Sequence, residues 1–207
     1  MKHIKLYRHP LSGHSHRAEL MLSLLNIDAE LVDVDLMQGA HKQPEFLQKN
    51  SFGQVPVLQD DDTVIADSNA ILVYLATQYD SRRRWLPEDS ESAALVQRFL
   101  SVAAGPLVSG PASARLVTVF GAGLNHQQAI EAAHSLLAVL NQHLKDRNWL
   151  AAAHPTIADV ANYTYIAHGP EGNVDLKDYP NVIAWLQRVE ALPGFVAMKP
   201  TAVGLAA

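Results

Sequence analysis

Two serines, Ser12 and Ser15, lie in the turn PLSGHSHR, where a predicted strand ends and a predicted helix begins. The first turn of a helix offers N–H groups without partners and a partial positive charge, which favour a bound anion, including a thiolate. A hydroxyl beside that anion can donate a hydrogen bond and lower the pKa of a thiol. The alternative, which the turn by itself favours, is that the serines only cap the helix.

The thiol for such chemistry has to come from outside the chain, because the sequence contains no cysteine. A free thiol has a pKa of ~8.5, and lowering it by about two units needs roughly 2.7 kcal/mol of preferential thiolate stabilisation. One charge-assisted hydrogen bond contributes about 1.5–3 kcal/mol, and a helix N-terminus about 0.3–1 kcal/mol. Together they are large enough to activate a bound thiol.

Two further segments carry polar groups or proline next to predicted elements. Asp67 and Ser68 open a predicted helix, where they either cap it or present carboxylate, hydroxyl and N–H groups to an amino-acid-like ligand. Capping alone is the simpler interpretation. The segment 50–58 contains the Val55-Pro56 bond. Only about 5–6% of X–Pro bonds in folded proteins are cis, so this dipeptide alone does not predict a cis bond.

Hydrophobic periodicity predicts an α/β half followed by a helical half. The first half reads as strand, helix, strand, helix, strand, strand and helix, over residues 4–7, 15–26, 30–34, 44–49, 55–58, 63–66 and 68–79. The second half contains only predicted helices, over residues 90–120, 125–147, 156–168 and 181–192. Gly-Pro pairs at 105–106 and 110–111 should kink or divide the first of these helices. We therefore expect an α/β domain over residues 1–80, a linker over 81–89 and an all-α domain over 90–207.

The composition argues against several functions. The chain has 207 residues and a formal net charge of −5, so no global positive field favours nucleic acid or an anionic membrane. The start of the chain lacks a signal-peptide stretch, and no segment approaches the ~20 apolar residues of a spanning helix, so we expect a cytoplasmic protein without a membrane partner. His14 and His16 lie two apart without a third ligand at zinc-like spacing, so no metal site is predicted.

Five motifs, in order and at matching intervals, resemble the cytosolic glutathione S-transferase family, and most of all its bacterial members with a Ser-Gly first turn. The motifs cover nearly the whole chain and read PLSGHSHRAELMLSLLNID, GAHKQPEFLQKNSFGQVPVL, DSNAILVYLA, WLAAAHPTIADVANYTY and YPNVIAWLQRVEALPGF. The fourth contains a capping box, with Thr156 at the N-cap and Asp159 in place of the usual Glu or Gln. The resemblance implies a thioredoxin-like first domain, βαβαββα with a mixed four-stranded sheet, followed by an all-α domain.

The resemblance also implies how glutathione is held. Pro56 would follow a cis bond, so that the backbone of Val55 pairs with the cysteinyl part of glutathione like an added strand. The Asp-Ser pair would hold the γ-glutamyl amine and carboxylate, and a His-Lys pair would meet the glycyl end, since a cation suits that carboxylate. The implied glutathione-binding residues are His41, Lys42, Gln54, Val55, Pro56, Asp67 and Ser68.

Ser12 matches the activating serine of the family best. Its distance to Arg17 is one residue longer than in some serine-type classes, and His14 stands where related bacterial turns have Asn. Ser15, which falls where several relatives carry Cys, and a backbone N–H group therefore remain alternatives for activating the thiol.

The resemblance further implies a second-substrate cleft between the domains. The residues expected there are His14, Leu107, Pro111 and Arg115. Arg115 could equally form an ordinary helix–helix salt bridge. Phe52 could insert into a partner subunit, although burial in its own chain is the simpler interpretation.

The family implies a detoxification enzyme that stabilises the glutathione thiolate for attack on an electrophilic carbon or a peroxide, most often as a two-fold symmetric homodimer. Alternatives are glutathione-dependent disulfide reduction, isomerisation or dehalogenation, and a non-catalytic binding module. The missing cysteine argues against disulfide reduction through a protein thiol. The identity of the second substrate does not follow from the sequence.

Overall fold

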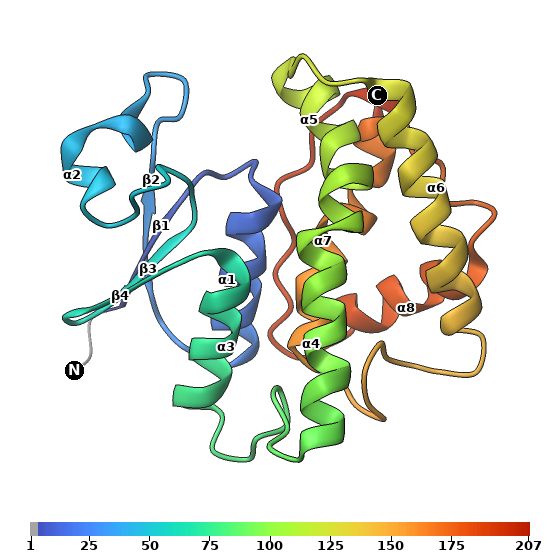
Figure 1. Cartoon of the computed structure of the whole chain (residues 1–207), viewed down its shortest axis with the longest axis horizontal. Helices are drawn as coiled ribbons and strands as arrows, with labels where there is room; N and C mark the ends of the chain where they lie inside the picture. Colours follow the sequence, from blue (N-terminus) through green and yellow to red (C-terminus); the bar gives the residue numbers. More distant parts are fainter. Residues whose placement is uncertain (1–3) are drawn as a thin grey trace. The chain divides into compact units, whose positions relative to one another are not determined.

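The structure is a computed structural model that describes residues 4–207. The chain forms two compact units (Figure 1). The first comprises the chain up to Arg83 together with Pro193–Lys199, and the second comprises Arg84–Leu192 and Pro200–Ala207. The first is an α/β unit and the second is helical, which confirms the predicted fold class.

The α/β unit contains a mixed four-stranded sheet. Its elements, in chain order, are β1 (Ile4–Arg8), α1 (Gly13–Leu24), β2 (Glu30–Asp33), the 3-10 helix η1 (Ala40–Lys42), α2 (Pro44–Leu47), β3 (Val57–Asp60), β4 (Thr63–Ala66) and α3 (Ser68–Tyr79). The strand order is β2-β1-β3-β4, with β1 parallel to β2 and antiparallel to β3, and β3 antiparallel to β4. This is the expected thioredoxin-like arrangement.

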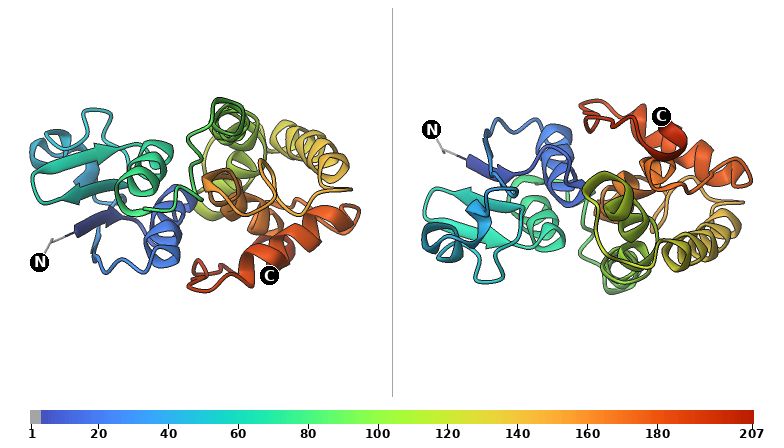
Figure 2. Two further views of the ribbon diagram at one scale, coloured as in Figure 1. Left: turned by 90° about the horizontal axis from the view of Figure 1, so that it is seen from below. Right: turned by 90° about the horizontal axis from the view of Figure 1, so that it is seen from above.

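The two faces of the sheet pack against different helices. Leu6 and Leu58 lie opposite each other on neighbouring strands and have no exposed surface. They belong to the face covered by α1 and α3, which pack against each other (Figure 1 and Figure 2). Side chains alternate along a strand, so the next pair, Tyr7 and Val57, lies on the other face, where both pack with Phe46 of α2.

The second unit is a set of helices. Its elements are α4 (Ser90–Ala104), the π-helical turn η2 (Val108–Ala112), α5 (Ser113–Phe120), α6 (His126–His143), α7 (Ile157–Ala167), the 3-10 turn η3 (Gly169–Gly172), α8 (Pro180–Glu190) and the 3-10 turn η4 (Gly204–Ala206). The Gly-Pro pairs interrupt the first long helix as predicted. Pro111 lies inside the π-helical turn, where its missing N–H removes a helical hydrogen bond.

The run Ser90–Phe120 is long and apolar enough, by length and composition alone, to cross a membrane, with a mean hydropathy of 1.2. Within the unit, α4 packs against α7 through a buried apolar stripe. The stripe consists of Val96, Phe99, Leu100 and Ala103. Core packing inside the helical unit thus explains these apolar residues of the run.

The helix α7 begins at the capping box that the sequence predicts. Thr156 Oγ1 accepts a hydrogen bond from the Ala158 N–H, and Asp159 Oδ2 accepts from the Thr156 N–H at 2.9 Å. The other carboxylate oxygen of Asp159 accepts from the Leu150 N–H and from Trp185 Nε1, both at 2.9 Å. Thr156 and Asp159 are buried, so this cap serves the core of the unit.

The segment Pro193–Lys199 belongs to the α/β unit, whereas the sequence assigned it to the all-α domain over residues 90–207. It contains no helix and lies along α1. His16 Nε2 forms a hydrogen bond with the Val196 carbonyl at 2.9 Å, and the Ser23 hydroxyl donates to the Gly194 carbonyl at 2.6 Å. Gly194 has a φ of +85° and an added Cβ would lie 2.8 Å from the Ser23 carbonyl, so this approach requires glycine.

Candidate active site

Ser12 is the N-cap of α1. Its N–H donates to the His9 carbonyl at 2.9 Å, and its hydroxyl oxygen accepts from the Ser15 N–H at 3.2 Å. Among residues 4–207, no protein atom accepts the proton of this hydroxyl. Because Ser12 is only half-buried, its hydroxyl can donate to a ligand beside the positive end of the helix.

Ser15 has a different environment. It is 1% exposed, and its hydroxyl oxygen accepts from the His9 N–H at 3.2 Å. Its side chain therefore lies beneath the turn. Of the two serines that the sequence left open, Ser12 has the greater surface for a ligand to contact.

Asp67 caps the second helix of the site, α3. Its Oδ1 accepts from the N–H groups of Asn69 and Ala70, both at 2.9 Å, and its carbonyl accepts from the Ile71 N–H at 2.9 Å. Asp67 is exposed and has a φ of 76°, a region that Asp and Asn enter more readily than other side chains. Within the described chain, neither its Oδ2 nor the Ser68 N–H has a hydrogen-bond partner. This helix end thus offers an acceptor and a donor suited to the ammonium and carboxylate of an amino acid.

The loop with the Val55-Pro56 bond lies against η1. The bond is cis, as the resemblance implies. Lys42 Nζ donates to the Gly53 carbonyl at 2.9 Å, and a Cβ on Gly53 would lie 2.7 Å from the His41 carbonyl. The residues expected at the glycyl end of glutathione and those expected at its cysteinyl part are therefore neighbours.

This loop also carries unused backbone hydrogen-bonding groups. The Asn50 side chain donates to the Gln54 carbonyl at 2.8 Å, and the Gln54 side chain is exposed. For Val55, neither the N–H nor the carbonyl is hydrogen-bonded to any residue in the range 4–207. Burial and the neighbouring Lys42 lower the pKa of His41, so the Lys42 ammonium supplies the positive charge here.

Comparisons with known proteins identify the family of this chain. The models of the glutathione S-transferase N-terminal and C-terminal domains match residues 2–77 and 125–193. Glutathione S-transferase 3 of Zea mays is 34% identical, over 94% of this chain and 92% of its own length. This chain belongs to the glutathione S-transferase family.

Two solved structures of family members extend the likeness to three dimensions. A glutathione S-transferase from Pseudomonas fluorescens has a TM-score of 0.88 and 31% identity, covering 94% of this chain and 98% of its own. A glutathione transferase homologue of Drosophila mojavensis with bound glutathione has a TM-score of 0.85 and 29% identity, covering 93% of this chain and 90% of its own.

A polar network joins the two helix ends of this family member, and the sequence did not predict it. Arg17 is 1% exposed and donates through Nη1 to Ser68 Oγ and to Asn69 Oδ1, both at 2.8 Å. His14 Nδ1 lies 3.2 Å from the same Ser68 oxygen. The sequence nevertheless contains a feature that indicates such a network. Arg17 lies four residues before Met21, on the apolar face of the predicted helix, where a charged residue needs a buried polar partner.

His14 contacts the Asp-Ser motif of α3 in this structure, whereas the sequence assigned it to the second-substrate cleft. Burial and the charge of Arg17 lower the pKa of His14 to about 3. The imidazole is therefore neutral at physiological pH, with one nitrogen as a donor and the other as an acceptor.

The other three residues expected near the second substrate are buried in the helical unit. Leu107 has no exposed surface, Pro111 is buried, and Arg115 is 1% exposed. Arg115 Nε donates to Glu171 Oε2 at 2.7 Å. This is a salt bridge of the kind that the sequence kept as the alternative for Arg115, and contact of these residues with a substrate stays a prediction.

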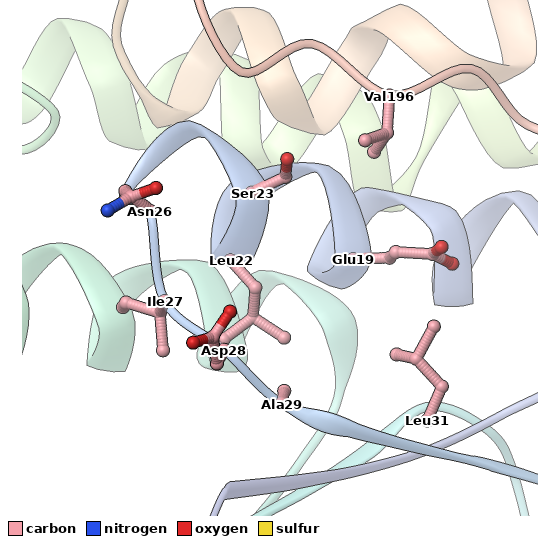
Figure 3. Close-up of a pocket in the computed structure, with 9 residues that line it drawn as sticks. All are labelled: Glu19, Leu22, Ser23, Asn26, Ile27, Asp28, Ala29, Leu31 and Val196. Carbon is pink, nitrogen blue, oxygen red and sulfur yellow. The ribbon is translucent and has the colours of Figure 1, made fainter.

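A cavity of about 260 Å³ opens elsewhere on the α/β unit (Figure 3). None of the predicted glutathione-binding residues lines it, and its Glu19 is ion-paired with Arg8 at 2.6 Å. The residues that line the cavity are Glu19, Leu22, Ser23, Asn26, Ile27, Asp28, Ala29, Leu31 and Val196.

In the part of the chain that the structure describes, there is no group of three or more His, Asp or Glu residues that could hold a metal ion.

Proposed function

We propose that this chain acts as a glutathione S-transferase in which Ser12 activates the bound thiol. The observation that carries the proposal is the Ser12 hydroxyl at the amino end of α1. Its oxygen already accepts a backbone N–H, and its proton has no acceptor within residues 4–207. Donation of that proton to sulfur stabilises the thiolate over the thiol and so lowers the thiol pKa.

In this proposal glutathione lies extended along the α/β unit. The N–H and carbonyl of Val55 pair with the cysteinyl backbone, which is supported by their lack of partners in the described chain. Asp67 and Ser68 hold the γ-glutamyl group, supported by the acceptor and donor at the start of α3. The glycyl carboxylate meets His41 and Lys42, Gln54 adds a hydrogen bond, and the cis bond before Pro56 orients the Val55 backbone.

The thiolate then attacks an electrophilic carbon or a peroxide oxygen. With a chlorinated aromatic compound, a sulfur–carbon bond forms, chloride leaves with the bonding electron pair, and the thiol proton passes to solvent. With a peroxide, the sulfur takes one oxygen as the O–O bond breaks and an alcohol is released; a second glutathione then displaces water to form the disulfide. The chain supplies orientation and a lowered thiol pKa, while glutathione is the nucleophile.

Ultraviolet titration of the thiolate of bound glutathione tests the role of Ser12. We expect a thiol pKa about two units below that of free glutathione, and a rise of about one to two units in Ser12→Ala. Ser12→Thr retains a hydroxyl and a cap, and should keep most of the shift. An unchanged titration in Ser12→Ala would reject Ser12 and point to Ser15 or a backbone N–H group.

Relatives named as transferases favour this reaction over the other reaction types and over a non-catalytic module. One of them, human glutathione S-transferase theta-2, is 30% identical over 92% of this chain and 82% of its own length. Turnover with a chlorinated aromatic compound and with an organic peroxide is the direct test. Retention on immobilised glutathione without turnover of any electrophile would support a binding module instead.

We also propose a cytoplasmic homodimer of the bacterial type with a Ser-Gly first turn. The bacterial type is supported by bacterial structures. One of them, from Rhodopseudomonas palustris, is described as a possible glutathione S-transferase and is 33% identical to this chain.

Phe52 supports the homodimer, because its side chain is 80% exposed and a partner surface would cover it. The expected burial of Phe52 in its own chain is wrong. Light scattering should give the mass of two chains, and Phe52→Ser should shift it toward one. Cell fractionation tests the location.

A further inference from the structure

The first turn of α1 carries three consecutive polar side chains that are almost completely buried. Ser15 and Arg17 are each 1% exposed, and His16 is 3% exposed. Successive side chains of an α-helix point about 100° apart, so these three leave the helix in three different directions. The Ser15 hydroxyl accepts from the N–H of His9 in the preceding turn, and Arg17 donates to the start of α3. His16 contacts a third segment.

This third segment is Pro193–Lys199, which we call the strap. It follows α8 in the chain and is part of the α/β unit. His16 Nε2 lies 2.9 Å from the carbonyl oxygen of Val196 in the strap. A carbonyl oxygen only accepts, so Nε2 carries a proton and donates it. Two residues further along, the side chain of Met198 is 4% exposed, so the strap is anchored close to this carbonyl.

Ser15 and His16 also hold the Ser12 cap through their backbones. The Ser15 N–H donates to Ser12 Oγ at 3.2 Å, and the His16 N–H donates to the Ser12 carbonyl at 2.9 Å. The position of the Ser12 hydroxyl therefore depends on where these two residues lie. Groups that stabilise a reacting atom have to be held within about 0.5 Å of their productive position, by neighbours that are themselves fixed.

We propose that His16 is a positioning residue, whose hydrogen bond to the strap holds the first turn of α1 so that the Ser12 hydroxyl points at the glutathione sulfur. The inference rests on the proposed function, because it explains how the activating hydroxyl of that function is kept in place. His16 acts through Ser12 and does not contact glutathione itself. The strap, which follows the last long helix, is thereby a support of the active-site turn.

Ultraviolet titration of the thiolate of bound glutathione tests this role. His16→Leu removes the donor, and we expect the thiol pKa to rise by about half a unit to one unit. At a pH near the wild-type thiol pKa, kcat with a chlorinated aromatic compound should then fall about two- to fivefold. KM for glutathione should change less than about twofold, because the groups proposed to bind the tripeptide lie on other segments. His16→Gln, whose side-chain Nε2 can donate at a similar reach, should keep the thiol pKa within about 0.2 units of the wild type.

Ser23→Ala is the matched control, because it removes a second hydrogen bond between α1 and the strap. The Ser23 hydroxyl donates to the Gly194 carbonyl at 2.6 Å, but Ser23 lies roughly 16 Å along the helix axis from Ser12. We expect this variant to leave the thiol pKa unchanged. An unchanged thiol pKa in a folded His16→Leu variant, or equal rises in His16→Leu and Ser23→Ala, would overturn the proposal.

Nitrogen NMR of histidine-labelled wild-type protein gives a second readout, which does not depend on the folding of a variant. We expect His16 Nε2 to carry a proton near neutral pH, and an Nε2 without a proton would overturn the proposal. Failure of the proposed function is distinguishable: an ordinary thiol pKa for glutathione bound to the wild type, or no change in Ser12→Ala, rejects the role of Ser12. A rise in Ser12→Ala without a rise in His16→Leu rejects only the role of His16.

Discussion

Two kinds of helix cap in this molecule use the same residue types and have opposite properties. At α7, Thr156 and Asp159 are buried, and both oxygens of the Asp159 carboxylate accept hydrogen bonds from the protein. At α1 and α3, Ser12 is half-buried and Asp67 is exposed, and each keeps a hydrogen-bonding group without a partner in the described chain. A saturated, buried cap can only stabilise the fold, whereas an unsaturated cap at the surface can also bind.

Substitution of Asp159, in the buried cap of α7, should have the largest effect on stability. Asp159→Ala leaves the N–H groups of Leu150 and Thr156 and the Trp185 indole N–H buried without their acceptor. We expect the free energy of unfolding to fall by about 3–5 kcal/mol. Urea denaturation followed by circular dichroism measures this loss. Asn125 is the exposed N-cap of α6. A loss in Asp159→Ala no greater than that in Asn125→Ala would remove the distinction between the two kinds of cap.

Glu171 provides a second test of buried, saturated polar groups in the helical unit. Its carboxylate accepts from Arg115 Nε at 2.7 Å and from the Thr201 hydroxyl at 2.6 Å, and lies 2.7 Å from His168 Nδ1. Burial alone would raise its pKa, but the hydrogen bonds from Thr201 and His168 and the charge of Arg115 outweigh burial and lower it to about 2.

A folded-state pKa below the ordinary value of 4.5 has a defined consequence for stability. The contribution of Glu171, about 3 kcal/mol, is fully present above the unfolded pKa and is lost as the pH falls from about 4.5 toward 2. Glu171→Gln removes this titration. The difference in unfolding free energy between wild type and variant should therefore shrink over that pH range, and a constant difference would contradict the assignment.

The periodic parts of the sequence predicted the elements closely. The predicted bounds of β4 and α3 are those observed, 63–66 and 68–79. The helix α1 begins at Gly13, two residues before its predicted start, because its first turn carries no apolar residue to extend the stripe. β3 begins at Val57, after Pro56, which has no N–H to donate to a ladder.

The sequence predicted the position of those candidate site residues that lie at the start of a helix. It did not predict the contacts that join distant segments of the chain. Ser12 and Asp67 could be placed from the strand-to-helix boundaries beside them. The contact of His14 with Ser68 joins positions 54 residues apart and depends on the rotamer of one side chain, which no local pattern encodes. The exposure of Phe52 was missed for a related reason, since an apolar loop residue carries no sign of what covers it.

A smaller effect is expected when the two surface caps Ser12 and Asn125 are compared. Each accepts a hydrogen bond from the backbone N–H three residues further along the chain, at 3.2 Å for Ser12 and 3.1 Å for Asn125. Ser12→Ala and Asn125→Ala should each lower the unfolding free energy by about 1 kcal/mol. Only Ser12→Ala should also raise the pKa of the thiol of bound glutathione. If Ser12→Ala lowered the unfolding free energy as much as Asp159→Ala, Ser12 would be a cap that mainly stabilises the fold, which would contradict the distinction between the two kinds of cap.

The smallest effect on stability is expected at Asp67, together with a clear effect on binding. Asp67→Asn keeps an oxygen that can accept from the N–H groups of Asn69 and Ala70, and Asn tolerates a φ of 76°. The unfolding free energy should change by less than about 0.5 kcal/mol. Removal of the negative charge from the ammonium site should weaken glutathione binding about tenfold. It should leave nearly unchanged the binding of deamino-glutathione, the analogue in which hydrogen replaces the α-amino group. Calorimetry on both ligands and thermal melting separate these effects. A variant that melts lower but binds glutathione like the wild type would mean that the α3 cap, like the one at α7, only holds its helix.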